Sequence, residues 1–255
     1  MPENFDEARA LAMMARGTVP MMGLKTALGA LAAAQTPPGL AGWRPLPSRK
    51  PTRASLVDEA QAKVMLAAAG IAVPRGQSAP DLDALLLLSK GLVGPFALKG
   101  LGFAHKSEAG AVRLGLETIE GQPAMAGAKG YLVEEMVTGT LAELLVGIRR
   151  DPVYGVSLTL GFGGVTAELL ADTVTMICPV TPPEVEAALQ RLRLWPLIYG
   201  YRGRVKADVD AVMAVAQSLQ AMMQDETFEE IEINPLMVRA QGAVAADAVI
   251  WKEMT

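Results

Sequence analysis

Carboxylate and amide side chains alternate along one short segment near the C-terminus. In the sequence EIEIN, a strand would place Glu230, Glu232 and Asn234 on one face and the two isoleucines on the other. Asp247 falls on the next expected strand, where it would face Asn234 across a hairpin. Carboxylate and amide oxygens are ligands that suit Mg²⁺. The pattern indicates a magnesium site, although an acidic strand face exposed to water has the same pattern.

A lysine ends another apolar strand, close to glycines. Lys99 follows the run FAL, and Gly100 and Gly102 come after it. A lysine ammonium contacts phosphate oxygens as a point charge, and glycines let backbone N–H groups approach an anion closely. The only histidine, His105, follows in the sequence HKSEAG. These residues fit a phosphate site, but a surface lysine and a hydrogen-bonded loop histidine leave the same pattern.

Three further segments carry weaker signals. An apolar strand that starts at Tyr131 runs into Glu134 and Glu135. The end of this strand suits contacts with an adenine edge and ribose hydroxyls, but a strand end without a ligand has the same pattern. Glu143 lies inside the apolar run LAELL, where a carboxylate is costly unless it is paired or faces a polar site. The glycine-rich turn GFGG, which starts at Gly161, fits an anion loop or a hairpin corner.

Composition limits the classes of protein and partner. The chain has 255 residues, of which 51% are hydrophobic and 20% charged, as in globular proteins. A net charge of −4 without a long basic run argues against nucleic acid and anionic membranes as partners. The single cysteine, Cys178, excludes an intrachain disulfide and Cys-rich zinc sites. Without a signal-peptide pattern or an apolar run of about 18 residues, we expect a cytoplasmic protein.

Helices and strands are mixed along the chain, which predicts an α/β or α+β fold. Two short helices are expected within residues 6–34, followed by a Pro- and Gly-rich stretch from Thr36 to Thr52. Ser55 is the expected N-cap of a helix that Gly70 ends. The other expected helices are 81–90, 183–192 and 207–223, and the expected strands are 71–74, 96–99, 112–116, 131–134, 141–149, 156–162, 173–177, 230–238 and 244–250.

Taken in order, these motifs resemble one family. ALKG, AHKSEAGAVRLGL, YLVEEM, LAELLVGIRRDPVYG, GFGG, GYRGR and EIEINPLMV, with Asp247, are similar to the ATP-grasp part of ADP-forming acyl-CoA synthetases, relatives of the succinyl-CoA synthetase β-subunit. The N-terminal GTVPMMGLKTALGALAAA looks like the tail of a CoA-ligase domain. The resemblance implies an N-terminal extension and linker (1–52) before the two ATP-grasp subdomains (53–130 and 131–255).

The resemblance also implies a reaction and its residues. Acid, CoA and ATP would give acyl-CoA, ADP and phosphate through an acyl phosphate and a phosphohistidine, with ATP or ADP and Mg²⁺ as cofactors. The residues implied to bind nucleotide are Lys99, Gly110, Glu134, Glu135, Met136 and Glu143, and those implied to hold Mg²⁺ are Asn234 and Asp247, with Glu232 close by. His105 would accept phosphate at the nucleotide site, assisted by Mg²⁺ and lysine.

Two departures from the family shape this expectation. Only Glu117 to Gly130 lies between the strand ending in LGL and the next strand, which barely leaves room for a crossover helix. The sequence also shows no CoA-binding domain and no principal phosphohistidine domain. We therefore expect half an enzyme that needs a CoA-binding α-type subunit or domain, with acetate, succinate and aryl acids all possible substrates. The alternatives are another ATP-grasp carboxylate ligase and a non-catalytic regulatory subunit whose nucleotide site has decayed.

Overall fold

The computed structural model describes residues 6–21, 23–35, 43–48, 53–103, 109–164 and 172–253. Contacts divide the chain into two units, Met1–Arg44 and Pro45–Thr255. The first unit holds α1 (Glu7–Met14) and α2 (Leu24–Gln35), which cover the predicted helical segment. Asp6 caps α1 by accepting a hydrogen bond from the Arg9 N–H at 3.0 Å. No helix in the described part of the chain is long and apolar enough to cross a membrane.

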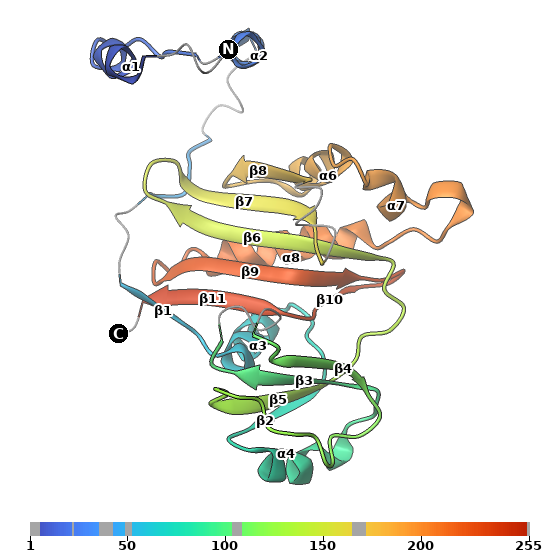
Figure 1. The fold of residues 1–255 in the computed structure, drawn as a ribbon. Helices are drawn as coiled ribbons and strands as arrows, with labels where there is room; N and C mark the ends of the chain where they lie inside the picture. Colours follow the sequence, from blue (N-terminus) through green and yellow to red (C-terminus); the bar gives the residue numbers. More distant parts are fainter. Residues whose placement is uncertain are drawn as a thin grey trace. The chain divides into compact units, whose positions relative to one another are not determined.

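A large sheet dominates the second unit (Figure 1). Its seven strands follow the order β1-β11-β9-β6-β7-β8, with β10 paired to β9, and all its strand pairs are antiparallel. The strands are β1 (Ala54–Leu56), β6 (Ala142–Asp151), β7 (Gly155–Phe162), β8 (Thr173–Ile177), β9 (Phe228–Val238), β10 (Ala243–Ala245) and β11 (Ala248–Glu253).

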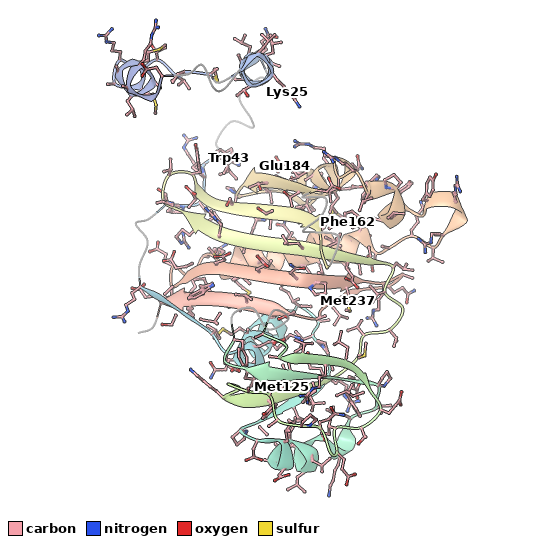
Figure 2. All side chains as sticks on the ribbon, in the orientation of Figure 1. Lys25, Trp43, Met125, Phe162, Glu184 and Met237 are labelled. Atoms are coloured by element: carbon pink, nitrogen blue, oxygen red, sulfur yellow. The ribbon has the colours of Figure 1, made fainter. Side chains whose placement is uncertain are left out.

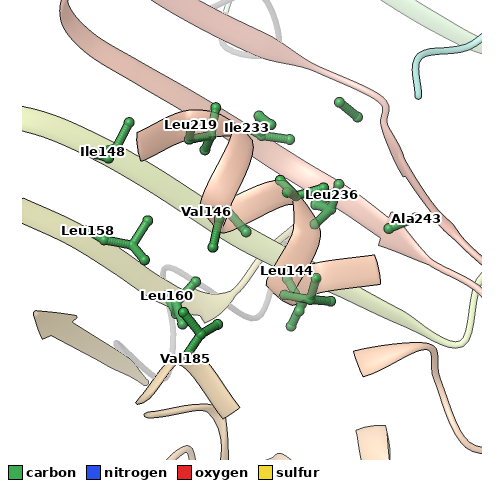
Figure 3. Close-up of a cluster of buried hydrophobic side chains, with 14 of the residues drawn as sticks. Leu144, Val146, Ile148, Leu158, Leu160, Val185, Leu219, Ile233, Leu236 and Ala243 are labelled. Carbon is green, nitrogen blue, oxygen red and sulfur yellow. The ribbon is translucent and has the colours of Figure 1, made fainter. Parts of the chain in front are cut away.

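Helices cover one face of this sheet, because apolar residues alternate along its strands. Figure 3 shows Leu144, Val146 and Leu160 of the central strands packed with Val185 and Leu219 from the covering helices. The helical segments of this part are α3 (Glu59–Ala68), α6 (Pro182–Gln190), α7 (Trp195–Tyr199), η3 (Tyr201–Gly203) and α8 (Val209–Met222).

A separate four-stranded antiparallel sheet has the order β2-β5-β3-β4. It consists of β2 (Gly76–Ala79), β3 (Phe96–Leu101), β4 (Val112–Leu116) and β5 (Gly130–Glu135), with α4 (Leu82–Leu88) and η2 (Ser89–Gly91) beside it. No helix forms between β4 and β5, as the short connection led us to expect. Instead Ile119 and Met125 (Figure 2) enter the small core, where the Met125 N–H donates to the Tyr131 hydroxyl at 3.0 Å.

The mixed α/β class is confirmed, but two local predictions are wrong. Ser55 lies in β1 opposite Lys252, and Asp58 caps α3 instead, since its carboxylate accepts a bond from the Ala60 N–H at 2.9 Å. Residues 71–74 form no strand. A hydrogen bond ties that segment to the large sheet, from the Ala245 N–H to the Ala72 carbonyl at 2.8 Å.

Strand pairing crosses the boundary that we predicted at residue 130. β5 hydrogen-bonds with β2 and β3 of the small sheet, although the prediction assigned it to the C-terminal subdomain. Conversely, β1 pairs with β11, and α3 packs against the large sheet, although both precede the small sheet in the chain. Within the second unit, the chain thus forms part of the large sheet first, leaves it to build the small one and returns at β6.

Candidate functional site

The polar face of the large sheet arises from the alternation that the sequence predicted. In β9, Ile231 and Ile233 are buried, whereas Glu232 and Asn234 are only half-buried. In the neighbouring strand β6, Glu143 is exposed, and β6 pairs with β9. The carboxylate of Glu143 therefore does not sit in the apolar core. It lies on the same polar face as Asn234.

The glycine turn after β7 bonds to both of these residues. The Gly163 N–H donates to the Glu143 carbonyl at 2.8 Å, and the Gly164 N–H donates to Asn234 Oδ1 at 3.3 Å. A Cβ on Gly164, whose φ is 63°, would collide with the Glu143 carboxylate. A Cβ on Gly163 would lie 3.0 Å from Asn234 Oδ1. The turn needs glycine at both positions because it approaches the two polar side chains closely.

Asp247 lies at a bend between β10 and β11 and not on a strand, which corrects its predicted position. It still meets Asn234, because the Asn234 N–H donates to the Asp247 carbonyl at 3.2 Å. Among the described residues, no group of three or more His, Cys, Asp or Glu side chains is arranged to hold a metal. Mg²⁺, however, is usually bound through one or two carboxylates, waters and substrate phosphates. The donor set of Asn234, Asp247 and the nearby Glu232 fits that chemistry, and its role stays a prediction.

Four buried charged side chains meet between the two sheets. Lys99 Nζ lies 2.8 Å from Glu59 Oε1 and 2.8 Å from Glu134 Oε2. Lys63 Nζ lies 2.6 Å from Glu134 Oε1 and 3.8 Å from Glu59 Oε1. Both lysines also donate to the Ala246 carbonyl, at 2.9 Å for Lys63 and 2.6 Å for Lys99. We call Glu59, Lys63, Lys99 and Glu134 the charge cluster. It brings Lys99 next to the bend that carries Asp247.

The two lysines of the charge cluster have opposite pKa shifts. Burial opposes the charge of Lys99, but Glu59, Glu134 and Asp247 outweigh it and raise the Lys99 pKa above its ordinary value. Burial and the charge of Lys99 lower the pKa of Lys63, in spite of its two carboxylate neighbours. Lys99 is therefore the firmly charged member of the pair, and Asp247 belongs to its electrostatic surroundings.

Sequence reasoning missed Glu59 and Lys63. Both lie on the buried face of α3, together with Ala62 and Leu66. The spacing of Glu59 and Lys63 in the sequence could have revealed them. Two opposite charges four residues apart lie on one face of a helix, and here that face also carries apolar residues. A charge on a buried face needs a partner, and that requirement predicts an ion pair with another element.

Glu135 and Met136 make their contacts within the small sheet. The Glu135 carboxylate accepts a bond from the Val93 N–H at 2.9 Å and pairs with Arg75 at 3.2 Å. The backbone N–H groups of Glu135 and Met136 donate to the Arg75 and Pro95 carbonyls, both at 2.9 Å. The predicted place of these residues at adenine and ribose, like that of Glu134, stays a prediction.

The structure describes the residues that flank the segment containing His105, up to Phe103 and from Ala109. His105 lies outside the described residues. Gly110 is exposed in the turn that leads into β4, and its φ of 64° favours glycine. Gly102 and Phe103, which precede that segment in the sequence, line a pocket of about 280 Å³ together with Glu59 and residues of β11. A cavity therefore adjoins both the charge cluster and the start of the histidine loop.

Comparisons with known proteins identify the family of the chain. A family model described as an ATP-grasp domain matches residues 49–251. Trans-feruloyl-CoA synthase from an unknown prokaryotic organism is 32% identical over 218 residues, which cover 78% of this chain but only 31% of that protein. The beta subunit of ADP-forming acetate–CoA ligase II from Pyrococcus furiosus is 28% identical over 211 residues, covering 75% of this chain and 89% of the subunit.

The fold of a solved relative is also similar. Dinucleotide forming acetyl-coenzyme A synthetase 1 from Ca. Korarchaeum cryptofilum, in complex with coenzyme A and Mg-AMPPCP, has a TM-score of 0.65 and 26% sequence identity. The match covers 76% of this chain and 92% of that chain, whose phosphohistidine segment points towards the nucleotide-binding site. The chain belongs to the family of ATP-grasp domains found in ADP-forming acyl-CoA synthetases.

Proposed function

We propose that this chain binds a magnesium nucleotide and transfers its phosphoryl group as the β-like part of an ADP-forming acid–CoA ligase. The observation that carries the proposal is the meeting of Glu143, Asn234 and the Gly163–Gly164 turn on one polar face. Glu143 and the turn come from the hairpin of β6 and β7, and Asn234 comes from β9, about 70 residues further along the chain. They combine an amide oxygen, a carboxylate and a close backbone turn, and Asp247 adjoins them.

Each of these groups has a role in the proposed chemistry. Asn234 and Asp247 would hold Mg²⁺, which neutralises charge on the phosphates when it is bound. The Gly163–Gly164 turn would position Asn234 through the bond from the Gly164 N–H to its Oδ1, and Glu143 would hold the nucleotide. Lys99, whose charge Asp247 helps to stabilise, would contact the phosphates of the nucleotide. His105 would accept the phosphoryl group and pass it on to the CoA-binding partner.

The acyl substrate and the partner belong to the rest of the proposed enzyme. Relatives that match the same part of the chain act on different acids: trans-feruloyl-CoA synthase, acetate–CoA ligase and 4-hydroxybutyrate–CoA ligase. Similarity to ligases of different acids supports the proposal that a CoA-binding α-type subunit or domain selects the acid. We therefore propose that this chain needs such a partner to form acyl-CoA.

Millimolar Mg-ATP should raise the melting temperature of the purified chain. A ligand at 100 times its dissociation constant stabilises by about 2.7 kcal/mol, which is about 5–11 °C for a domain of this size. The Asp247→Asn variant, or removal of Mg²⁺ with EDTA, should abolish the shift. Differential scanning fluorimetry measures it, with Glu186→Gln at a half-buried position of α6 as the control. Equal shifts in the wild type and Asp247→Asn would remove Asp247 from the site, and no shift in any protein would favour the regulatory-subunit alternative.

Radioactive ATP labelled at the γ-phosphate should leave acid-labile phosphate on the wild-type chain and none on His105→Ala. A phosphoimidazole forms when the neutral imidazole attacks the γ-phosphorus and ADP leaves. Another ATP-grasp carboxylate ligase would not need this step, so the experiment separates the two enzyme classes. Mg-ATP should still stabilise His105→Ala, which shows that the variant is folded. Label that persists in His105→Ala would exclude this histidine as the acceptor.

A further inference from the structure

The charge cluster leaves Lys99 no hydrogen-bond donor for a phosphate. An ammonium group has three N–H donors. Lys99 Nζ is 2.8 Å from Glu59 Oε1, 2.8 Å from Glu134 Oε2 and 2.6 Å from the Ala246 carbonyl. Since its side chain is only 6% exposed, water does not compete for these positions. A phosphate oxygen can bind Lys99 only after one of the three acceptors has been released.

Lys63 shares the Ala246 carbonyl with Lys99 and binds the other carboxylate oxygen of Glu134, Oε1. Its Nζ already lies 2.6 Å from Glu134 and 2.9 Å from the Ala246 carbonyl, and 3.8 Å from Glu59. A buried carboxylate that loses its only cation is strongly destabilising. With Lys63 in place, Glu134 keeps a cation when Lys99 turns away. The second lysine therefore removes the main energetic obstacle to releasing Lys99.

The Ala246 carbonyl connects this exchange to the predicted magnesium site. Ala246 directly precedes Asp247, and both lysines bind its carbonyl. Asn234 in turn binds the Asp247 carbonyl. Any change of the α3 side chains thus acts on Lys99 and on the backbone that carries Asp247. Neither Glu59 nor Lys63 belongs to the polar face formed by Glu143 and Asn234.

We propose that Glu59 and Lys63 are positioning residues of the nucleotide site: Glu59 holds Lys99 away from phosphate, and Lys63 neutralises Glu134 so that Lys99 can be released. The inference rests on the proposed function. It predicts opposite effects on nucleotide affinity for Glu59 and Lys63, which lie four residues apart on α3. Loss of Lys63 should weaken nucleotide binding, whereas loss of the Glu59 charge should strengthen it. A purely structural ion pair would not give changes of opposite sign.

Calorimetric titration with Mg-ATP tests this at 15 °C and 0.15 M salt, where exposed charges are screened. Loss of a residue that orients a metal ligand typically lowers affinity by about 10–100-fold, and we take this as the scale for a positioning residue. We expect Lys63→Met to raise Kd by at least about tenfold, Lys63→Arg to restore most of the affinity, and Glu59→Gln to lower Kd. Lys90→Met, which removes an exposed lysine from η2, should bind like the wild type.

Melting curves without nucleotide show whether each variant is folded at the titration temperature. If Lys63→Met is unfolded, the direction in which Glu59→Gln changes the Kd tests the positioning role. That substitution keeps the size of the side chain. Folded Lys63→Met with wild-type Kd, or Glu59→Gln with a raised Kd, overturns the positioning role and leaves the proposed function standing. Absence of Mg-ATP binding by the wild type overturns both.

Discussion

Replacing Glu134 with leucine should lower the free energy of unfolding by about 3–5 kcal/mol, because it leaves two buried lysines with one carboxylate. Glu134 is only 2% exposed, and its two oxygens lie 2.6 Å from Lys63 and 2.8 Å from Lys99. Glu59 is the remaining anion of the charge cluster. Urea unfolding followed by circular dichroism measures the change.

Adding Lys63→Met to Glu134→Leu should recover most of the lost stability. The double variant removes one cation and one anion and keeps the pair of Lys99 and Glu59, 2.8 Å apart. Replacing a buried ion pair with apolar side chains is often neutral or stabilising, whereas removing one partner is not. If the double variant is as unstable as Glu134→Leu, the loss does not come from uncompensated charge but from the shape of the side chain.

Leu144→Ala should destabilise the protein by about 2–5 kcal/mol, whereas the neighbouring substitution Glu143→Ala should cost less than about 0.5 kcal/mol. Leu144 is 0% exposed within the core of the large sheet (Figure 3), so its truncation leaves a cavity. Glu143 is exposed on the opposite face. Thermal unfolding should show a loss of several degrees for the first variant and almost none for the second.

Mg-ATP binding should show the opposite pattern, with the larger loss in Glu143→Ala and none in Leu144→Ala. Glu143→Ala should weaken Mg-ATP binding by about 10–100-fold, the worth of a hydrogen bond to a charged group. Leu144→Ala, measured at a temperature where it is folded, should bind as the wild type does. The two variants thus separate core packing from nucleotide binding along one strand. A loss of stability in Glu143→Ala equal to that in Leu144→Ala would contradict the assignment of the two faces.

The parts of the fold that were predictable depend on local periodicity. The alternation in EIEIN predicted which side chains of β9 are buried, because a strand gives period two wherever one face is covered. The proximity of Glu143 to the glycine turn was not predictable in this way. It results from the pairing of β6 with β7 and β9, and single-sequence patterns do not specify which strands pair.

The charge cluster was not predicted for the same reason. Its members come from α3, β3 and β5, and the sequence does not specify that these three elements meet. The motif comparison pointed to Lys99 and Glu134 but assigned them to nucleotide contacts, whereas the structure pairs them with each other. Ser55 was a poor choice of N-cap because the short strand β1, which contains it, forms only through its distant partner β11.

That distant pairing affects how the chain can fold during synthesis. β1 pairs with β11 at the other end of the domain, and Lys63 donates to the Ala246 carbonyl 183 residues further along. Until Ala246 has left the ribosome, Lys63 and Lys99 lack an acceptor that the mature protein gives to both. Contacts of such long sequence separation form late and slow folding. All residues of the small sheet are thus synthesised long before its charged side chains can be buried. The two sheets should therefore fold together as one cooperative unit.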